Sequence, residues 1–175
     1  RSATQAAAGV LCYKASTSET DAIGDVSMAV LRLLLELGRG GPLIDGFAYW
    51  LLETPQCAGV NALKTLFLRA RGNVVVMSDV AALLRLFFKS GGSKATQAFL
   101  ANDHCLDTAS GTSKTLLDNS SCLLICGLKA HILDALPAFH IIKVLADLAH
   151  EGGSMAAIAL VAAGVIAAIR ETLGL

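Results

Sequence analysis

The sequence predicts an all-α domain built from pairs of helices that glycines separate. Three observations predict this class: apolar residues recur at helical spacing, glycine pairs interrupt them, and hydrophobic residues make up 54% of the 175-residue chain. A composition this apolar excludes disorder over most of the chain. Residues 1–17, which are small and polar, are expected to form a flexible arm, and residues 18–175 a single helical domain.

The first predicted helix pair follows candidate capping residues at positions 18–21. Apolar residues then recur at helical spacing over residues 26–37, and a glycine-rich turn at residues 38–41 stops the helix. Pro42 opens a second helix, because its fixed φ suits the first helical turn, and Pro55 ends that helix.

Two later segments repeat this arrangement of amphipathic helix, glycine pair and more apolar helix. The second copy spans residues 79–100 and turns at the glycine pair 91–92. The third copy spans residues 142–169 and turns at the glycine pair 152–153. Glycines that follow helices in this way indicate turns with positive φ, so a phosphate-binding loop is not expected here.

Each interval between glycine pairs holds one more predicted helix, near residues 60–70 and near residues 116–135. The intervals exceed the roughly 40 to 47 residues of the common helical repeats. Insertions are therefore expected at residues 72–77 and 108–121. Residues 73–77 include a β-branched run, which predicts an extended connector or the first turn of a helix.

The most apolar stretch, residues 155–169, carries no polar side chain. Crossing a bilayer takes about 20 residues, and this stretch is shorter. A buried core helix is therefore expected, and not a stable membrane span.

The order of elements in the third copy resembles an armadillo repeat. Residues 134–138 lead into a helix over residues 139–149, which a glycine turn and a third helix follow. Residues 48–52 and 98–102 resemble the corresponding third helices. The similarity to armadillo and HEAT repeats extends loosely over residues 25–172 and implies a short α-solenoid of about three repeats that share one core. A compact multi-helix bundle is the alternative fold.

This resemblance also implies a function. Third helices in these families line a groove in which tryptophan and asparagine side chains hold an extended peptide, and Trp50 and Asn102 match those residue types. Arg85 and Lys89 belong to a basic segment, residues 64–94, that would flank the groove and steer an acidic partner. The expected function is a protein-interaction or scaffold module that presents a helical-repeat surface to a partner protein or peptide.

A second hypothesis is a helical bundle that binds a lipid or a pigment, or that inserts into a membrane. The apolar stretch at residues 155–169 follows an amphipathic stretch at residues 122–149, and this arrangement resembles the hydrophobic hairpin of pore-forming helical domains. Extraction of the purified protein followed by mass spectrometry separates the two hypotheses, since only the second predicts a bound lipid or pigment.

Catalysis is not expected, and neither a metal nor a cofactor is predicted. Asp103, His104, Cys105 and Asp107 form the one cluster that suggests such chemistry, but adjacent residues on a helix point about 100° apart. His104 and Cys105 therefore cannot readily serve one another.

Three histidines in the last third of the chain suggest a weaker alternative. His140 and His150 are ten residues apart and could share one helix face, with His131 nearby in sequence, which would permit a pH-sensitive contact. Separately placed structural or exposed histidines are the simpler expectation.

Charge and cysteine usage restrict the partners and the compartment. The 14 basic and 14 acidic residues balance, so no overall field favours nucleic acid. Five cysteines at irregular spacing predict mostly reduced thiols in a cytoplasmic protein, and Cys122 and Cys126, one helical turn apart, are not expected to bond. Homo-oligomerisation is compatible with this composition.

Overall fold

The structure is a computed structural model of the chain, and it describes residues 6, 9–10, 25–39, 44–53, 58–101 and 120–175. Every regular element in these ranges is a helix, so the predicted all-α class is confirmed. The elements are α2 (Asp25–Arg39), α3 (Ile44–Glu53), α4 (Ala58–Arg69), the 3-10 helix η2 (Ala70–Gly72), α5 (Val74–Ala101), α7 (Ser120–Ala130), α8 (Ala135–Ala162) and α9 (Val165–Leu173).

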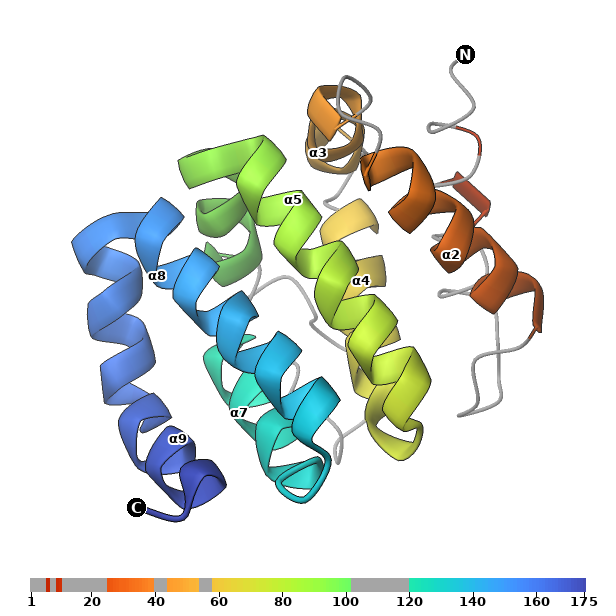
Figure 1. Ribbon diagram of the computed structural model, residues 1–175. Helices are drawn as coiled ribbons and strands as arrows, with labels where there is room; N and C mark the ends of the chain where they lie inside the picture. The colour runs from red at the N-terminus through yellow and green to blue at the C-terminus, as the bar shows by residue number, and fades with distance from the viewer. Residues whose placement is uncertain (1–5, 7–8, 11–24, 40–43, 54–57, 102–119) are drawn as a thin grey trace, which may run out of the picture.

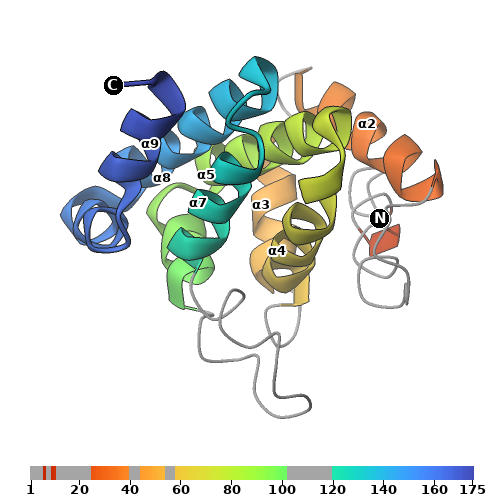
Figure 2. The ribbon, with the colours of Figure 1, turned by 90° about the horizontal axis from the view of Figure 1, so that it is seen from below.

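The helices lie in rows. In Figure 1, α2 and the first parts of α5 and α8 lie side by side, and both α2 and α8 contact α5. A second row runs from α4 to α7 to α9, since α7 contacts both of the others, and Figure 2 shows α4 and α7 on one side of the first row. One continuous cluster of buried apolar side chains draws on each of the seven α-helices named above.

Four phenylalanines of this cluster come from α4 and α5. Phe67 of α4 and Phe87, Phe88 and Phe99 of α5 are fully buried. The rings of Phe88 and Phe99 meet edge to face with centroids 5.2 Å apart, a favourable geometry because a ring edge is positive and a ring face negative. Both halves of α5 thereby contribute to one core.

The predicted glycine turns are confirmed at the second and third pairs. α5 bends at Gly92 (φ 53°, ψ −139°) and α8 bends at Gly153 (φ 62°, ψ −154°). These backbone angles lie in a region that essentially only glycine occupies, so each pair sets a sharp corner between two helical segments. The first glycine pair, at residues 40–41, lies outside the described residues.

The two corners pack in equivalent ways. A Cβ added at Gly91 would lie 3.1 Å from the Cβ of Ala48, so α3 sits directly on the corner of α5. A Cβ added at Gly152 would collide with Thr96, so the second part of α5 (93–101) sits directly on the corner of α8 (Figure 1). We call each arrangement of helix, glycine pair and helix a unit. In both places glycine permits the last helix of one unit to approach the backbone of the next unit.

The expected insertion at residues 72–77 is wrong. Asn73 caps α5, because its side-chain oxygen accepts hydrogen bonds of 3.1 Å from the backbone N–H groups of Val75 and Val76. Of the two alternatives for the β-branched run, the first turn of a helix is therefore the one observed. Most of the second expected insertion, at residues 108–121, lies outside the described residues.

The apolar stretch at residues 155–169 differs from its expected form in two ways. It is not one helix, because Gly164 adopts a left-handed conformation (φ 88°) that separates α8 from α9. It is also not a buried core helix: Ala156 and Leu160 are buried, whereas Met155 and Ile158 are 78% and 65% exposed. The α8 helix has a core only on one side, so its remaining apolar side chains face outward.

Candidate interaction surface

Equivalent positions on two helices carry exposed side chains next to the corner contacts. On α3, Tyr49 follows the corner residue Ala48 and is 62% exposed; on α5, Gln97 follows the corner residue Thr96 and is exposed. Gly153 follows Gly92 by 61 residues, so Ala157 and Ile158 of α8 correspond to Thr96 and Gln97 of α5. We call Tyr49 and Gln97 the third-helix row.

The structure only partly describes the two residues predicted to hold a peptide. Trp50 lies on α3, adjacent in sequence to Tyr49, but its side chain is outside the described part of the chain. Asn102 is outside the described residues altogether, and so are Asp103, His104, Cys105 and Asp107. The structure therefore places the backbone of one of the two residues beside the third-helix row.

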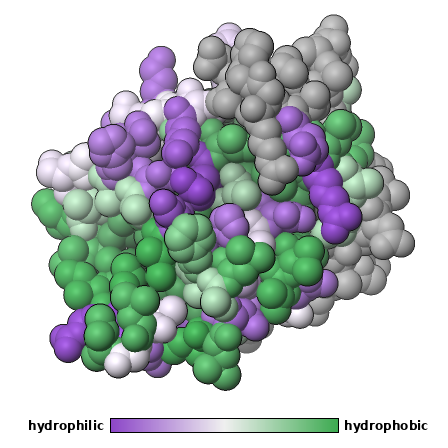
Figure 3. All heavy atoms as spheres, in the orientation of Figure 1, coloured by the Kyte–Doolittle hydropathy of each residue, from purple (hydrophilic) through white to green (hydrophobic). Residues whose placement is uncertain are grey.

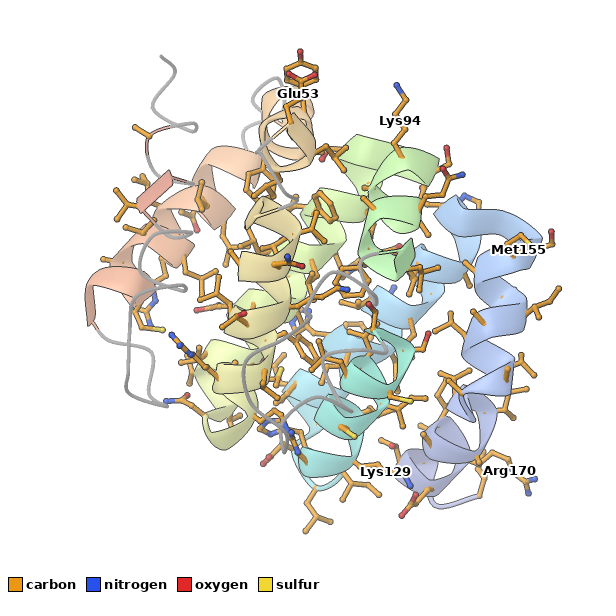
Figure 4. The ribbon with its side chains drawn as sticks, turned by 180° about the vertical axis from the view of Figure 1, so that it is seen from behind. Glu53, Lys94, Lys129, Met155 and Arg170 are labelled. Atoms are coloured by element: carbon orange, nitrogen blue, oxygen red, sulfur yellow. The ribbon has the colours of Figure 1, made fainter. Side chains whose placement is uncertain are left out.

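The basic segment separates into exposed and internal residues. Lys89 and Lys94 are exposed on either side of the α5 corner, and Figure 4 shows the Lys94 side chain extending away from the edge of the molecule. Lys64, in contrast, is fully buried, with its ammonium nitrogen 5.2 Å from the centre of the Phe99 ring. Lys64 therefore belongs to the interior and not to a basic surface.

Arg85 connects two neighbouring helices of the first row. Its Nε lies 2.7 Å from Oδ2 of Asp147, which joins α5 to α8, and only about a fifth to a quarter of either side chain is exposed. A charge-assisted hydrogen bond of this length neutralises much of the field that Arg85 would present to a partner. Lys89 is consequently the better placed of the two residues predicted to steer an acidic molecule.

Tyr49 is positioned by the last residue of its own helix. A hydrogen bond to the Glu53 carboxylate and the negative charge of that group raise the pKa of the Tyr49 hydroxyl. The phenol is protonated at neutral pH even without this shift, and its ring has one polar end. Such side chains are common at protein interfaces because they combine a large rigid area with a donor.

An exposed apolar surface covers the end of the molecule formed by α8 and α9. We call this surface the C-terminal apolar face; its large members are Met155, Ile158, Val161, Ile166, Leu173 and Leu175. In Figure 3, hydrophobic residues gather over the side where Figure 1 shows the second part of α8 and α9. Contiguous exposed apolar surface of this kind typically marks a place where a protein or a membrane binds. Sequence reasoning missed it because 155–169 was expected to be core.

The three histidines occupy different environments. His131 is buried at the turn between α7 and α8, where its Nδ1 lies 2.9 Å from Oδ2 of Asp134. His140 is half-buried on α8 and His150 is exposed. The described residues therefore bring no histidine pair together as one site.

Acidification is expected to destabilise the protein through His140. Burial, and then the positive charge of Arg85, lower the pKa of His140 from 6.5, while Asp79 opposes this shift. Because the unfolded chain binds the proton more readily, stability is complete above about pH 6.5 and falls as the pH drops below it. Urea unfolding between pH 5 and pH 8 measures this slope, and His140→Gln should reduce it. An unchanged slope in the variant would assign it to other groups.

The described ranges hold no group of three or more His, Cys, Asp or Glu residues that could bind a metal ion. Cys122 and Cys126 are both half-buried thiols without a disulfide bond, as expected from their spacing. No family model, no curated protein and no solved structure matches the chain.

Proposed function

We propose that this chain is a protein-interaction module in which successive helical units present the third-helix row to a partner protein or peptide. The observation that carries this proposal is the equivalence of the two glycine corners, because it relates Tyr49 and Gln97 by one packing rule. A packing unit that repeats along the chain is the construction principle of α-solenoids, which use their extended surfaces for binding. The resemblance of residues 25–172 to armadillo and HEAT repeats supports the same interpretation.

The chemistry of the row favours an acidic, extended partner. Lys89 and Lys94 border the second unit, while Tyr49 supplies an aromatic ring in the first. Basic residues at the border of a surface accelerate encounter with an acidic molecule, and a central aromatic residue slows its dissociation. In this proposal Trp50, next to Tyr49, contributes to the same anchor.

The location of the partner can be tested by photo-crosslinking. A benzophenone amino acid replaces Gln97 or, separately, Tyr49, and the protein is irradiated in an extract of its native source. The matched control carries the same group at Lys143, an exposed residue on the first part of α8. We expect one shared set of crosslinked proteins at positions 97 and 49 that is absent at position 143. Identical products at all three positions would contradict the proposed surface.

Charge replacement then tests the steering role with the captured partner. Lys89→Ala is expected to slow association several-fold at low salt and to flatten its salt dependence, because an exposed border charge acts on encounter. Arg85→Ala is expected to change association less, since Asp147 already neutralises Arg85. Lys143→Ala is the control. Equal effects of Lys89→Ala and Lys143→Ala would show that only net charge matters.

Binding of a lipid is the second candidate function, and one observation favours it. Among the described helices, Ala135–Ala162 has the length and hydropathy of a membrane-crossing helix, and only 28% of its most apolar window is buried. Mass spectrometry of an organic extract of the purified protein tests this function. A stoichiometric lipid would favour it over a protein partner.

A further inference from the structure

The C-terminal apolar face continues the stacking surface of the preceding units. Ala48 of α3 and Thr96 of α5 are fully buried, because the glycine corner of the following unit covers them. The equivalent residue of α8 is Ala157, which is only half-buried, and Val161 one turn later is 56% exposed. The helix surface that is covered in the first two units is therefore open in the third.

The size of this face matches one half of a stable protein interface. The area that full burial of a large apolar side chain removes from water sets the scale. On that scale, the exposed parts of the six large apolar side chains add up to about 400 Å². A standard interface buries about 800 Å² on each partner, of which somewhat more than half is apolar. The face is thus large enough to supply the apolar part of one side.

Charges at the border of the face suit a protein partner better than a bilayer. No charged residue occurs from Met155 to Ile169. Figure 4 shows Lys129 and Arg170 at the end of the molecule opposite Met155, and Lys129 pairs with Glu171 at 3.2 Å. An anionic membrane attracts borders that are uniformly basic, whereas a border with both signs can complement itself.

We propose that the C-terminal apolar face binds the same face of a second copy of this chain, so that the protein forms a twofold symmetric dimer. In such an interface the same residues occur on both sides, and pairing of the two faces closes the assembly at two chains. The α8 and α9 helices of one copy then cover the α8 and α9 helices of the other. This proposal does not depend on the partner of the third-helix row, because the dimer is tested with the purified protein alone.

The test is light scattering during size-exclusion chromatography, between 1 and 100 µM protein. The expected result is a mass that rises with concentration to twice the 18.1 kDa of one chain. Val161→Glu places a charge in the face and is expected to raise the dimer dissociation constant at least 30-fold, as for a central residue of an interface. Ile166→Glu, on α9, should have the same effect and guards against a defect specific to α8.

Val75→Glu is the matched control, because Val75 is 54% exposed near the start of α5, away from this face. Circular dichroism must show equal helix content in all three variants, and Val75→Glu must leave the dimer intact. A dimer that survives both Val161→Glu and Ile166→Glu would overturn the proposal. A wild-type protein that is monomeric at 100 µM would also overturn it. Flotation with vesicles of phosphatidylcholine and phosphatidylserine then shows whether a membrane binds the monomer instead.

Discussion

Gly127→Ala is expected to destabilise the fold by about 3 kcal/mol, the upper part of the range for overpacking a core. Gly127 is buried on α7, and a Cβ at this position would lie 2.5 and 2.6 Å from two ring carbons of Phe67. Phe67 is itself fully buried, so its ring has little space in which to retreat. The close approach of α4 and α7 depends on the absence of a side chain here.

Urea unfolding followed by circular dichroism measures this effect. Gly72→Ala is the control, since Gly72 is exposed, has no positive φ and would place its Cβ against no atom within 4 Å. The control should change stability by less than about 0.5 kcal/mol, as is usual for surface substitutions. The double variant with Phe67→Leu and Gly127→Ala should lose less stability than the sum of the losses in the two single variants, because the two residues are in contact. Additive effects would mean that the clash is relieved elsewhere.

Gly153→Ala is expected to destabilise the protein by about 1 to 3 kcal/mol through the backbone alone. No atom lies within 4 Å of a Cβ at Gly153, so sterics with neighbours contribute nothing. The conformation at φ 62° and ψ −154° is instead one that residues with a Cβ strongly avoid. Gly92→Ala should have a similar effect at the corner of α5, and the double variant should lose more stability than either single variant.

The stability loss of Gly164→Ala can be compared with the losses of Gly92→Ala and Gly153→Ala. Its φ of 88° and ψ of 24° lie in the left-handed helical region, and its Cβ would also meet no atom within 4 Å. This region disfavours ordinary residues by roughly 1 to 2 kcal/mol, so Gly164→Ala should be the milder change. Urea unfolding of the three single variants gives the order. A milder effect at Gly153 than at Gly164 would contradict the role assigned to the corner conformation.

Local features of the sequence were sufficient to predict most helices. The 3.6-residue periodicity of apolar side chains depends only on neighbours along the chain, and it located α2, α3, α4 and the first parts of α5 and α8. The glycine pairs at 91–92 and 152–153 were interpretable for the same reason, because positive φ is a property of a single residue. Gly164 is also a glycine within a helical stretch, and a turn predicted at this residue would have located the break between α8 and α9.

Pairings between distant residues followed from no local pattern. Arg85 meets Asp147 although 62 residues separate them, so a residue predicted to be a border charge instead links α5 to α8. Lys64 is charged and was expected on the surface, yet tertiary packing encloses it beside Phe99. Charge and spacing define what a side chain can bind, but only the arrangement of helices decides what lies next to it.

By itself the sequence determined the all-α class, most of the helix positions and the glycine corners at 91–92 and 152–153, since each follows from backbone preference and apolar periodicity. Only the tertiary structure decided which apolar faces have a neighbour. Residues 155–169 are equally apolar on every side, yet Leu160 is buried and Ile158 is 65% exposed, because one side of α8 packs on the core and no described helix covers the other. Burial depends on contacts between elements, and the hydrophobicity of a segment does not specify them.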